Sequence, residues 1–337
     1  MLMRDILSRP RSLGRLHESP ADAALEIARN AWEGRDADTV RATHAPDARV
    51  VTPTSVTEGV EDLEGCTTRT NAMFPERRNH VEEAAAVARE RRVVSAGRIV
   101  STMRHTSDSH YGPAGARRIT VRTLTDTVLR DNAIEDEWMV RDRAAIVRQL
   151  GGDVEAVGRT HGLDWRGSNM AHPPATYARR WRGGPSWYEP EGIAAELVAL
   201  MRATWSGENG RPVPLIARAF DHAVEAHMPG GVTLHGAHDV AAWFVDWAGS
   251  FTDARFRLEN WVEARGPSVP ARIALRWSVR ATHGGCGHFG EPTGQPVALL
   301  GLTQLELRRG RVHRLDMGLD ELAIWAQVSG FRSPYAL

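Results

Sequence analysis

The chain has 337 residues, of which 42% are hydrophobic and 25% are charged, and its 42 basic residues balance 42 acidic ones. A single hydrophobic core stops growing at roughly 250 to 300 residues, so we expect at least two domains. The balanced charge gives no general attraction for nucleic acid or for an anionic membrane. The sequence contains no lysine, so Schiff-base chemistry with a carbonyl substrate is excluded.

Residues 1–20 form an N-terminal extension without the apolar run of roughly 7 to 15 residues that a signal peptide needs. No stretch reaches the roughly 18 apolar residues that span a membrane, so we expect a cytoplasmic protein. Cys66 and Cys286 match no metal-ligand spacing, which indicates reduced thiols. The stretch from His105 to His110 has a spacing compatible with a metal site, but its strand-to-loop position favours no metal.

The first domain, residues 21–150, is predicted to begin with an amphipathic helix that ends at Gly34. The apolar face of this helix carries Leu25, Ala28 and Trp32. A further helix follows Gly59, and the pattern then changes to long alternating strands. Asp142, at the end of the last strand, is placed to cap a final short helix.

Residues 151–193 form a connector rich in Gly, Pro, Arg and Trp, too long for a tight loop. We expect its tryptophans, Trp165, Trp181 and Trp187, to pack on a surface. The second domain, residues 194–330, precedes a tail at 331–337. Its predicted first helix carries Val198, Met201 and Trp205 on one face.

The helix that follows Gly236 also has one apolar face, formed by Val240, Trp243, Phe244, Trp247 and Phe251. Alternation is clearest in the strand over residues 271–283, where Ile273, Leu275, Trp277, Val279 and His283 share one face. The chain returns in two further strands, and Asp320 then caps a last helix.

The two domains repeat one another in sequence. Five residues recur 177 positions later without a gap: Gly59, Asp62, Phe74, Arg78 and Glu82 return as Gly236, Asp239, Phe251, Arg255 and Glu259. Further along the offset is 178, and His105, Asp142 and Gln149 return as His283, Asp320 and Gln327. Helices followed by a run of strands are typical of an α+β fold. We therefore predict two cone-shaped domains, each a curved antiparallel sheet covered by about three helices around an apolar pocket.

Two stretches, IEDEWMVRDRAAIVRQLG at 134–151 and ATHGGCGHFGEPTGQPV at 281–297, carry a family likeness. The chain resembles the SnoaL-like polyketide cyclases of the nuclear transport factor two-like superfamily over both domains. The resemblance implies intramolecular aldol closure of a polyketide ester by acid and base groups, without metal or organic cofactor. The family's histidine falls at Thr125 and Thr303 and its aspartate at Met139 and Met317, so both copies depart from the usual acid/base pair.

The second copy offers two histidines as catalytic candidates. His283 shares the apolar face of its strand, and His313 shares a face with Leu315 and Met317, so we expect the two to converge in one cone. The competing interpretation is a structural histidine with a satisfied hydrogen bond. His288, in the Gly-rich loop, is a candidate for the pocket mouth.

In the first copy the same alternation groups Glu135, Glu137 and Met139, with His105 on a neighbouring strand. Glu137 and His105 are a plausible base and acid for removing a proton next to a carbonyl. The alternative turns the opposite face inward, with Ile134, Trp138 and Val140 lining the interior, because a slip of one residue reverses such assignments.

The candidate substrate-binding residues are Trp243, Trp247, Trp277, His288, Thr303, Met317, Thr125, Met139 and Tyr111. The tryptophans suit a flat or hydrophobic ligand, and ordinary core packing is their alternative. We expect a cofactor-independent enzyme that cyclises, isomerises, dehydrates or hydrolyses a small hydrophobic carbonyl compound. The alternative function is a non-catalytic binding module. We also expect the two domains to pack on each other as a pseudo-dimer.

Overall fold

The computed structural model describes residues 33, 38–89, 92–131, 133–164, 189–206, 212–266 and 269–330. The extension at 1–20, the first predicted helix around Trp32, the three connector tryptophans and the tail at 331–337 lie outside these residues. The described chain forms two compact units. The first contains most of residues 38–152, and the second contains residues 153 onward together with Pro53–Ser55 and Asp142–Ala144.

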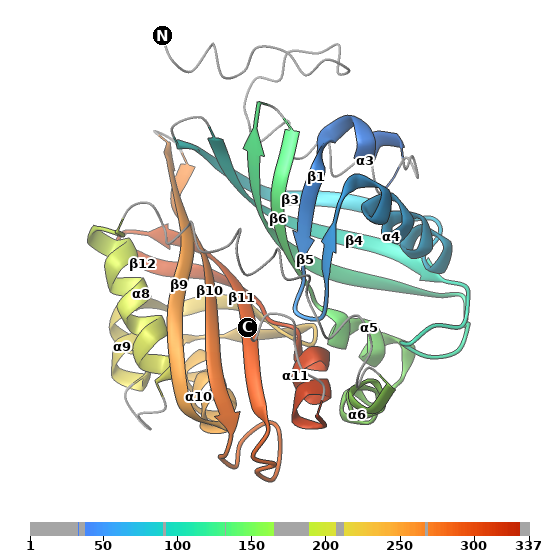
Figure 1. Ribbon diagram of the computed structural model, residues 1–337. Coiled ribbons are helices and arrows are strands. Elements are labelled where there is room, and N and C mark those ends of the chain that lie inside the picture. Colours follow the sequence, from blue (N-terminus) through green and yellow to red (C-terminus); the bar gives the residue numbers. More distant parts are fainter. Residues whose placement is uncertain are drawn as a thin grey trace. The chain divides into compact units, whose positions relative to one another are not determined.

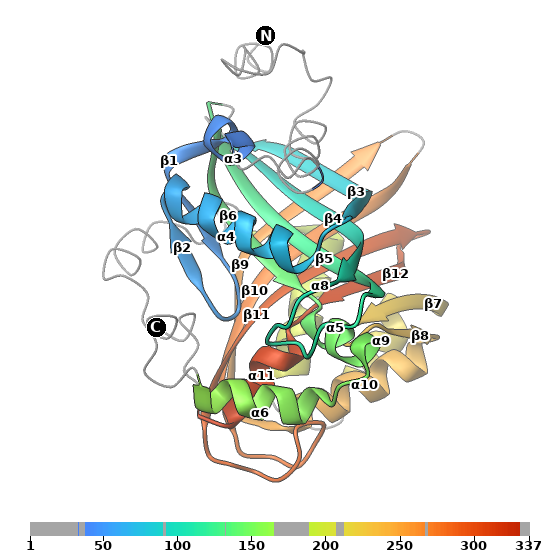
Figure 2. The ribbon, with the colours of Figure 1, turned by 90° about the vertical axis from the view of Figure 1, so that its right-hand side faces the viewer.

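The first unit is a six-stranded sheet in the order β2-β1-β6-β5-β4-β3. Its elements in chain order are α3 (Asp38–Thr43), β1 (His44–Val51), β2 (Val56–Glu58), α4 (Val60–Met73), β3 (Arg78–Arg89), β4 (Arg92–His105), β5 (Arg117–Arg130), β6 (Ala133–Arg141) and α5 (Arg143–Leu150). In Figures 1 and 2, α4 runs across one face of this sheet. Val60 and Leu63 of α4 pack there against Ala48 of β1.

The second unit repeats this plan, with the strand order β8-β7-β12-β11-β10-β9. Its elements are α6 (Val154–Asp164), α8 (Gly192–Trp205), α9 (Pro212–Ala219), β7 (Phe220–Met228), β8 (Val232–His235), α10 (Ala237–Gly249), β9 (Phe251–Gly266), β10 (Val269–His283), β11 (Pro296–Arg308), β12 (Arg311–Gly318) and α11 (Glu321–Val328). The predicted α+β class is confirmed. The sheets are antiparallel except where β1 pairs with β6 and β7 with β12, which run parallel.

Equivalent contacts in the two units show that the sequence repeat is a structural one. Gln149 exchanges two hydrogen bonds with the backbone of Thr120, and Gln327 does the same with Ala298. Each glutamine ties the last helix of its repeat to the penultimate strand. The ion pair of Arg98 with Glu82 likewise recurs as that of Arg276 with Glu259.

The predicted connector begins with a helix that the sequence analysis did not anticipate. Helix α6 packs closely on α11 inside the second unit, because Gly158 and Gly162 leave no side chain between them. A Cβ added to Gly158 would lie 2.3 Å from the Cβ of Trp325, and one added to Gly162 would lie 2.5 Å from the carbonyl oxygen of Ala326. These two glycines therefore set the helix-to-helix distance.

The two aspartates at the ends of the last strands both accept hydrogen bonds from backbone N–H groups. Asp320 caps α11 as predicted, accepting a hydrogen bond from the backbone N–H of Ala323 at 3.2 Å. The carboxylate of Asp142, which belongs with the second unit, accepts hydrogen bonds from the backbone N–H groups of Gly230 and Gly231 at 2.9 and 2.8 Å. Asp142 therefore fixes the turn between β7 and β8.

Candidate functional site

The helix-covered face of the first sheet carries three rows of cross-strand partners over β4, β5 and β6. Residues paired across antiparallel strands point to the same face. Glu137 is opposite Val50 in β1, which packs with Ala48 under α3 and α4, so these rows face the helices. The rows are Ser95–Thr127–Glu137, Gly97–Thr125–Met139 and Ile99–Thr123–Arg141.

This geometry settles which way β6 is turned. Glu137 and Met139 face the helices, as the alternation indicated, and Trp138 and Val140 lie on the opposite face. A bulge between Asp136 and Ile134 breaks the alternation, so Ile134 is opposite Leu129 and packs with it on the helix-covered face. The opposite face is also polar in part, since Arg49 of β1 pairs there with Asp136 through Nη2 and Oδ1 at 2.5 Å. The alternative with Trp138 lining the interior is therefore wrong.

Glu137 is the strongest candidate for acid/base chemistry in the first unit. Its side chain keeps some accessible surface although protein surrounds it. Removal from water raises the pKa of its carboxyl to about 7, and the positive charge of Arg141 opposes that rise. A carboxyl group with this pKa exchanges a proton near neutral pH, as a general base requires.

Electrostatic interactions connect this carboxyl to Arg141, and Arg141 in turn to Arg77 and its neighbour Tyr111. Arg141 acts electrostatically on both Glu137 and Arg77, and Tyr111 acts on Arg77. Burial, together with the neighbouring charge of Arg141, lowers the pKa of Arg77 to about 9. The guanidinium Nη2 atoms of Arg77 and Arg141 lie 3.6 and 3.7 Å from the sulfurs of Met103 and Met139. We call Arg77, Tyr111, Glu137 and Arg141 the polar cluster.

The polar cluster has no counterpart in the second unit. At the repeat offsets of 177 and 178, the positions equivalent to Arg77, Tyr111, Glu137 and Arg141 are Ala254, Phe289, Leu315 and Leu319. Strand pairing supports the equivalence, since Arg78 pairs with Thr102 as Arg255 pairs with Arg280. Sequence reasoning missed Arg77 and Arg141, and comparing the two copies at these offsets would have found them.

A tryptophan fills the matching region of the second unit. Trp277 has no exposed surface and lies across Gly301, with its ring centroid 5.3 Å from that of Trp205 in α8. Its indole N–H donates to the hydroxyl of Thr303 at 2.8 Å. The equivalent residue in the first unit, Ile99, is smaller and half-buried. Trp277 is thus part of a packed core, so the structure favours core packing over ligand binding for this residue.

The positions where the resemblance placed the family's acid/base pair are neighbours in both sheets. Thr125 is paired across the strands with Met139, and Thr303 with Met317. The hydroxyl of Thr303 lies 3.4 Å from the sulfur of Met317, and both residues are buried. Both copies therefore have side chains without acid or base function at this point.

The predicted pairs of catalytic residues do not form. Arg117 is the partner of His105 on β5 and Thr127 that of Glu137, so ten residues of β5 separate the two candidates. His105 is fully buried, its Nε2 lies 2.8 Å from the hydroxyl of Ser109, and burial lowers its pKa. These contacts fit the structural alternative for this histidine.

His283 and His313 likewise lie far apart. His283 is opposite Phe251 and hydrogen-bonded to the hydroxyl of Thr293 at 2.9 Å. His313 lies at the other end of the sheet, near the start of β12 and the turn that precedes Arg311. Burial lowers the pKa of His283, and the charge of Arg159 lowers it further. The expected convergence in one cone is wrong, because the two histidines lie at opposite ends of β11 and the length of that strand separates them.

The remaining aromatic candidates form a stack along α10. The ring of Trp247 stacks on Trp243 at 4.3 Å and on His288 at 4.7 Å, between centroids. The Nε2 of His288 lies 3.0 Å from the buried carboxylate of Glu321, and its Nδ1 lies 3.5 Å from Asp246. Trp247 is buried and Trp243 half-buried, so the stack joins α10 to the loop after β10. Tyr111, the last candidate, is buried, and its ring centroid lies 5.9 Å from that of Phe74.

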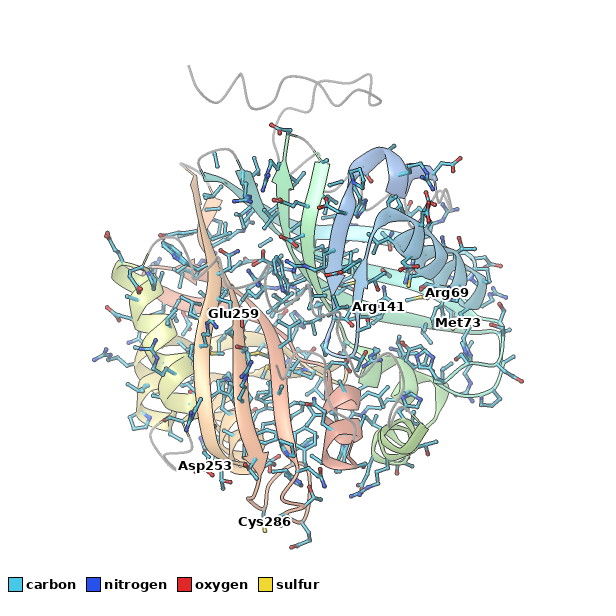
Figure 3. The ribbon with its side chains drawn as sticks, viewed as in Figure 1. Arg69, Met73, Arg141, Asp253, Glu259 and Cys286 are labelled. Atoms are coloured by element: carbon cyan, nitrogen blue, oxygen red, sulfur yellow. The ribbon has the colours of Figure 1, made fainter. Side chains whose placement is uncertain are left out.

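An open groove of about 770 Å³ lies on the second unit between α10 and the same loop. Cys286 lines it and is exposed, and Figure 3 shows this cysteine at the tip of the loop between β10 and β11. Among the described residues, no group of three or more His, Cys, Asp or Glu side chains is arranged to hold a metal ion. Within the same part of the chain, no helix is long and apolar enough to cross a membrane.

Fold and site define an α+β protein with two related helix-covered sheets, one of which holds a buried acid/base group. Residues 22–150 match the model of the SnoaL-like polyketide cyclase family, and residues 198–315 match that of the SnoaL-like domain. The chain belongs to the SnoaL-like family, as two such domains in tandem.

Solved structures similar to the chain match about one domain each. IdmH, a putative polyketide cyclase from Streptomyces antibioticus, is 26% identical, with 40% of this chain and 99% of that one covered and a TM-score of 0.35. A putative SnoaL-like polyketide cyclase from Jannaschia is 19% identical, with 41% and 98% covered and a TM-score of 0.35. A protein with a ketosteroid isomerase-like fold from Catenulispora acidiphila, in complex with trimethylamine, is 17% identical, with 38% and 92% covered and a TM-score of 0.32. No curated protein matches the chain.

Proposed function

We propose that the first unit is a cofactor-independent acid/base catalyst acting on a small hydrophobic carbonyl compound. The observation that carries this proposal is Glu137, a carboxyl with a pKa of about 7 on the helix-covered face. The buried Met139 and the half-buried Ile99 supply apolar surface in the next two rows of the same face. Membership of the SnoaL-like polyketide cyclase family agrees with this chemistry.

In this mechanism Glu137, as the carboxylate, takes a proton from the carbon next to the carbonyl. The electron pair of the broken C–H bond forms the enolate double bond, and negative charge develops on the carbonyl oxygen. Arg141 already interacts with Glu137, so a positive charge is available beside the developing oxyanion. Return of the proton at another carbon completes an isomerisation, and attack of the enolate on a second carbonyl completes a cyclisation.

We assign a structural role to the second unit. Its interior is closed by Trp277, Trp205 and Phe244, with Trp205 meeting the edge of Phe244 at 6.3 Å between centroids. Leu315 replaces Glu137 at the equivalent position, so the acid/base group is missing as well. The absence of the carboxyl and the filling of this region by Trp277 argue for loss of catalysis in this copy.

Proton abstraction is testable without the natural substrate. We expect the full-length protein to accelerate exchange of the methyl hydrogens of 2-acetylnaphthalene in D₂O, followed by NMR. Glu137→Gln is expected to reduce that acceleration by about 10²-fold or more. The matched control is Glu135→Gln on the same strand, whose carboxylate pairs with Arg92 and Arg130 instead. Exchange no faster than in buffer, or full activity in Glu137→Gln, contradicts the assignment.

The same experiment addresses the alternative of a non-catalytic binding module. A binding module would change the intrinsic tryptophan fluorescence on addition of 2-acetylnaphthalene and leave its exchange rate at that of buffer. An enzyme would both change its fluorescence and accelerate the exchange. Glu137→Gln would then keep the binding and lose the acceleration of exchange.

We infer further that the protein is cytoplasmic and that the two units pack on each other as a pseudo-dimer. The tandem of related units in one chain supports the pseudo-dimer, because it takes the place of two separate subunits. A compact body of this length has a radius of gyration of about 20 Å, which small-angle scattering measures. A clearly larger value for a monomeric chain contradicts the packing, and cell fractionation tests the location.

A further inference from the structure

A row of three polar side chains crosses the helix-covered face of the first sheet. Ser95, Thr127 and Glu137 are direct partners on β4, β5 and β6, three neighbouring strands that Figure 1 shows side by side. The Cβ atoms of directly opposite residues lie about 4.5 to 5.5 Å apart, so Thr127 is next to both Ser95 and Glu137. We call these three residues the polar row.

The two hydroxyl groups of the polar row are buried without a partner. Ser95 is 2% exposed and Thr127 is 5% exposed. Neither hydroxyl forms a hydrogen bond with any residue that the structure describes. A buried hydroxyl without such a bond costs free energy, and an aliphatic side chain would occupy the same position without that cost. These two hydroxyls would therefore gain from a hydrogen bond to a bound molecule.

The second unit has the same row built from aliphatic side chains. At the repeat offset of 178 the polar row is replaced by three buried residues that pair in the same register, Ile273, Leu305 and Leu315. An aliphatic row is thus sufficient to build the sheet. The two hydroxyls and the carboxyl occur together in one copy and are absent together from the other. Their joint presence follows the chemistry of the site rather than the architecture.

The protein also has smaller side chains beside the polar row in the first unit. Gly97 and Ile99 stand where the second unit has Leu275 and Trp277. Even a Cβ added to Gly97 would lie 2.7 Å from the Oγ1 of Thr125, so a leucine does not fit at this position. Less protein volume next to the polar row is what a ligand with an apolar ring system requires.

We propose that the hydroxyl groups of Ser95 and Thr127 bind the carbonyl oxygen of the substrate, and that the substrate is a ketone attached to an apolar ring system. The inference rests on the proposed function in placing this carbonyl beside Glu137. Hydroxyl donors at an oxygen that gains negative charge stabilise the enolate, and low local polarity strengthens these bonds. Thr127 is the nearer donor, because it is directly opposite the proposed base.

The binding test compares a ketone with the same carbon skeleton lacking the oxygen, in the full-length protein. Equilibrium dialysis measures the affinities for 2-acetylnaphthalene and 2-ethylnaphthalene, and their ratio is compared between variants. Ser95→Ala and Thr127→Val should each lower the affinity for the ketone relative to the hydrocarbon by about threefold or more. Thr127→Val should also reduce the acceleration of hydrogen exchange in 2-acetylnaphthalene by about tenfold or more.

Thermal unfolding separates a ligand-binding hydroxyl from a structural one. Ser95→Ala and Thr127→Val remove hydroxyls without a partner in the protein, so the thermal midpoint of each variant should stay the same or rise. The matched control is Thr303→Val in the second unit, whose buried hydroxyl accepts a hydrogen bond from the indole N–H of Trp277. This control should lower the thermal midpoint and leave the ratio of affinities unchanged.

Oxygen binding and proton abstraction fail separately in this design. Glu137→Gln keeps both hydroxyls, so it should retain the ratio of affinities while it loses the exchange activity. If Glu137→Gln keeps the exchange activity while Thr127→Val lowers the ratio, the proposed base is wrong and the role of the hydroxyls stands. Three results overturn that role: no binding of 2-acetylnaphthalene, an unchanged ratio in the double variant of Ser95→Ala and Thr127→Val, or a loss of stability in that variant as large as in Thr303→Val.

Discussion

Replacement of Glu137 by glutamine should make the first unit more stable above neutral pH. The folded-state pKa of this carboxyl is about 7, above the value of 4.5 for an unperturbed glutamate. The native state therefore holds a proton that the unfolded state has released, and raising the pH removes the stability linked to that proton. The loss begins near pH 4.5 and is complete above pH 7.

The size of the effect follows from the difference between the two pKa values. Each pKa unit corresponds to about 1.4 kcal/mol, so the native state loses about 3 kcal/mol between pH 4 and pH 8. Glu137→Gln does not titrate and escapes this loss. Its advantage over the unaltered protein should therefore grow by about 3 kcal/mol over the same range.

Urea titrations at several pH values measure this advantage. A short pulse of hydrogen exchange, followed by mass spectrometry of peptides from β5 and β6, reports the unfolding of the first unit alone. Glu135→Gln, which loses an ion pair at the edge of the same strand, should show no stabilisation that grows with pH. If the difference between Glu137→Gln and the unaltered protein stays constant from pH 4 to pH 8, Glu137 is not the desolvated carboxyl described here.

Three other outcomes follow from the same contacts. The second-order rate constant for exchange of 2-acetylnaphthalene should rise with pH to a plateau with a midpoint near 7, since the base Glu137 must be ionised. A rate constant that falls over this range refutes the role of Glu137 as the base. Gly301→Ala would place a Cβ 2.2 Å from the ring of Trp277 and should destabilise the second unit by about 1 to 3 kcal/mol. Gly249→Ala, whose added Cβ would lie 4.0 Å from the nearest atom, should be tolerated. Thermal unfolding of both variants measures the difference. Gln327→Ala leaves the buried N–H and carbonyl of Ala298 without their partner and should cost about 1 to 3 kcal/mol, more than Gln149→Ala at its exposed equivalent; equal losses in urea unfolding would contradict this.

The duplication and the fold class could be read from the sequence because they depend on local pattern. Period-two alternation determined which residues of β10 share a face, and the nearly constant offset predicted two copies of one unit. In β6 a bulge that alternation does not reveal moved Ile134 onto the face of Glu137. The helix over Val154–Asp164 escaped prediction, since its composition resembles the Gly-rich segment after it and only packing on α11 reveals Gly158 and Gly162 as contact residues.

Which residues meet along a strand was decided by tertiary structure. Alternation placed His105 and Glu137 on one face, but strand register separated them by ten residues of β5, and the same cause separated His283 from His313. A pKa near 7 for Glu137 also required the folded chain, because it comes from the loss of water around a carboxyl that is ordinary in sequence.

The sequence by itself determined the repeat, the succession of helices and then strands in each copy, and the shared face of the regular strand β10, since these follow from spacings of a few residues. The tertiary structure alone decided that Trp277 closes the second unit and that Arg77 lies near Arg141 in the first. Such contacts join residues far apart in the chain, and their distance depends on how whole elements pack rather than on any local pattern.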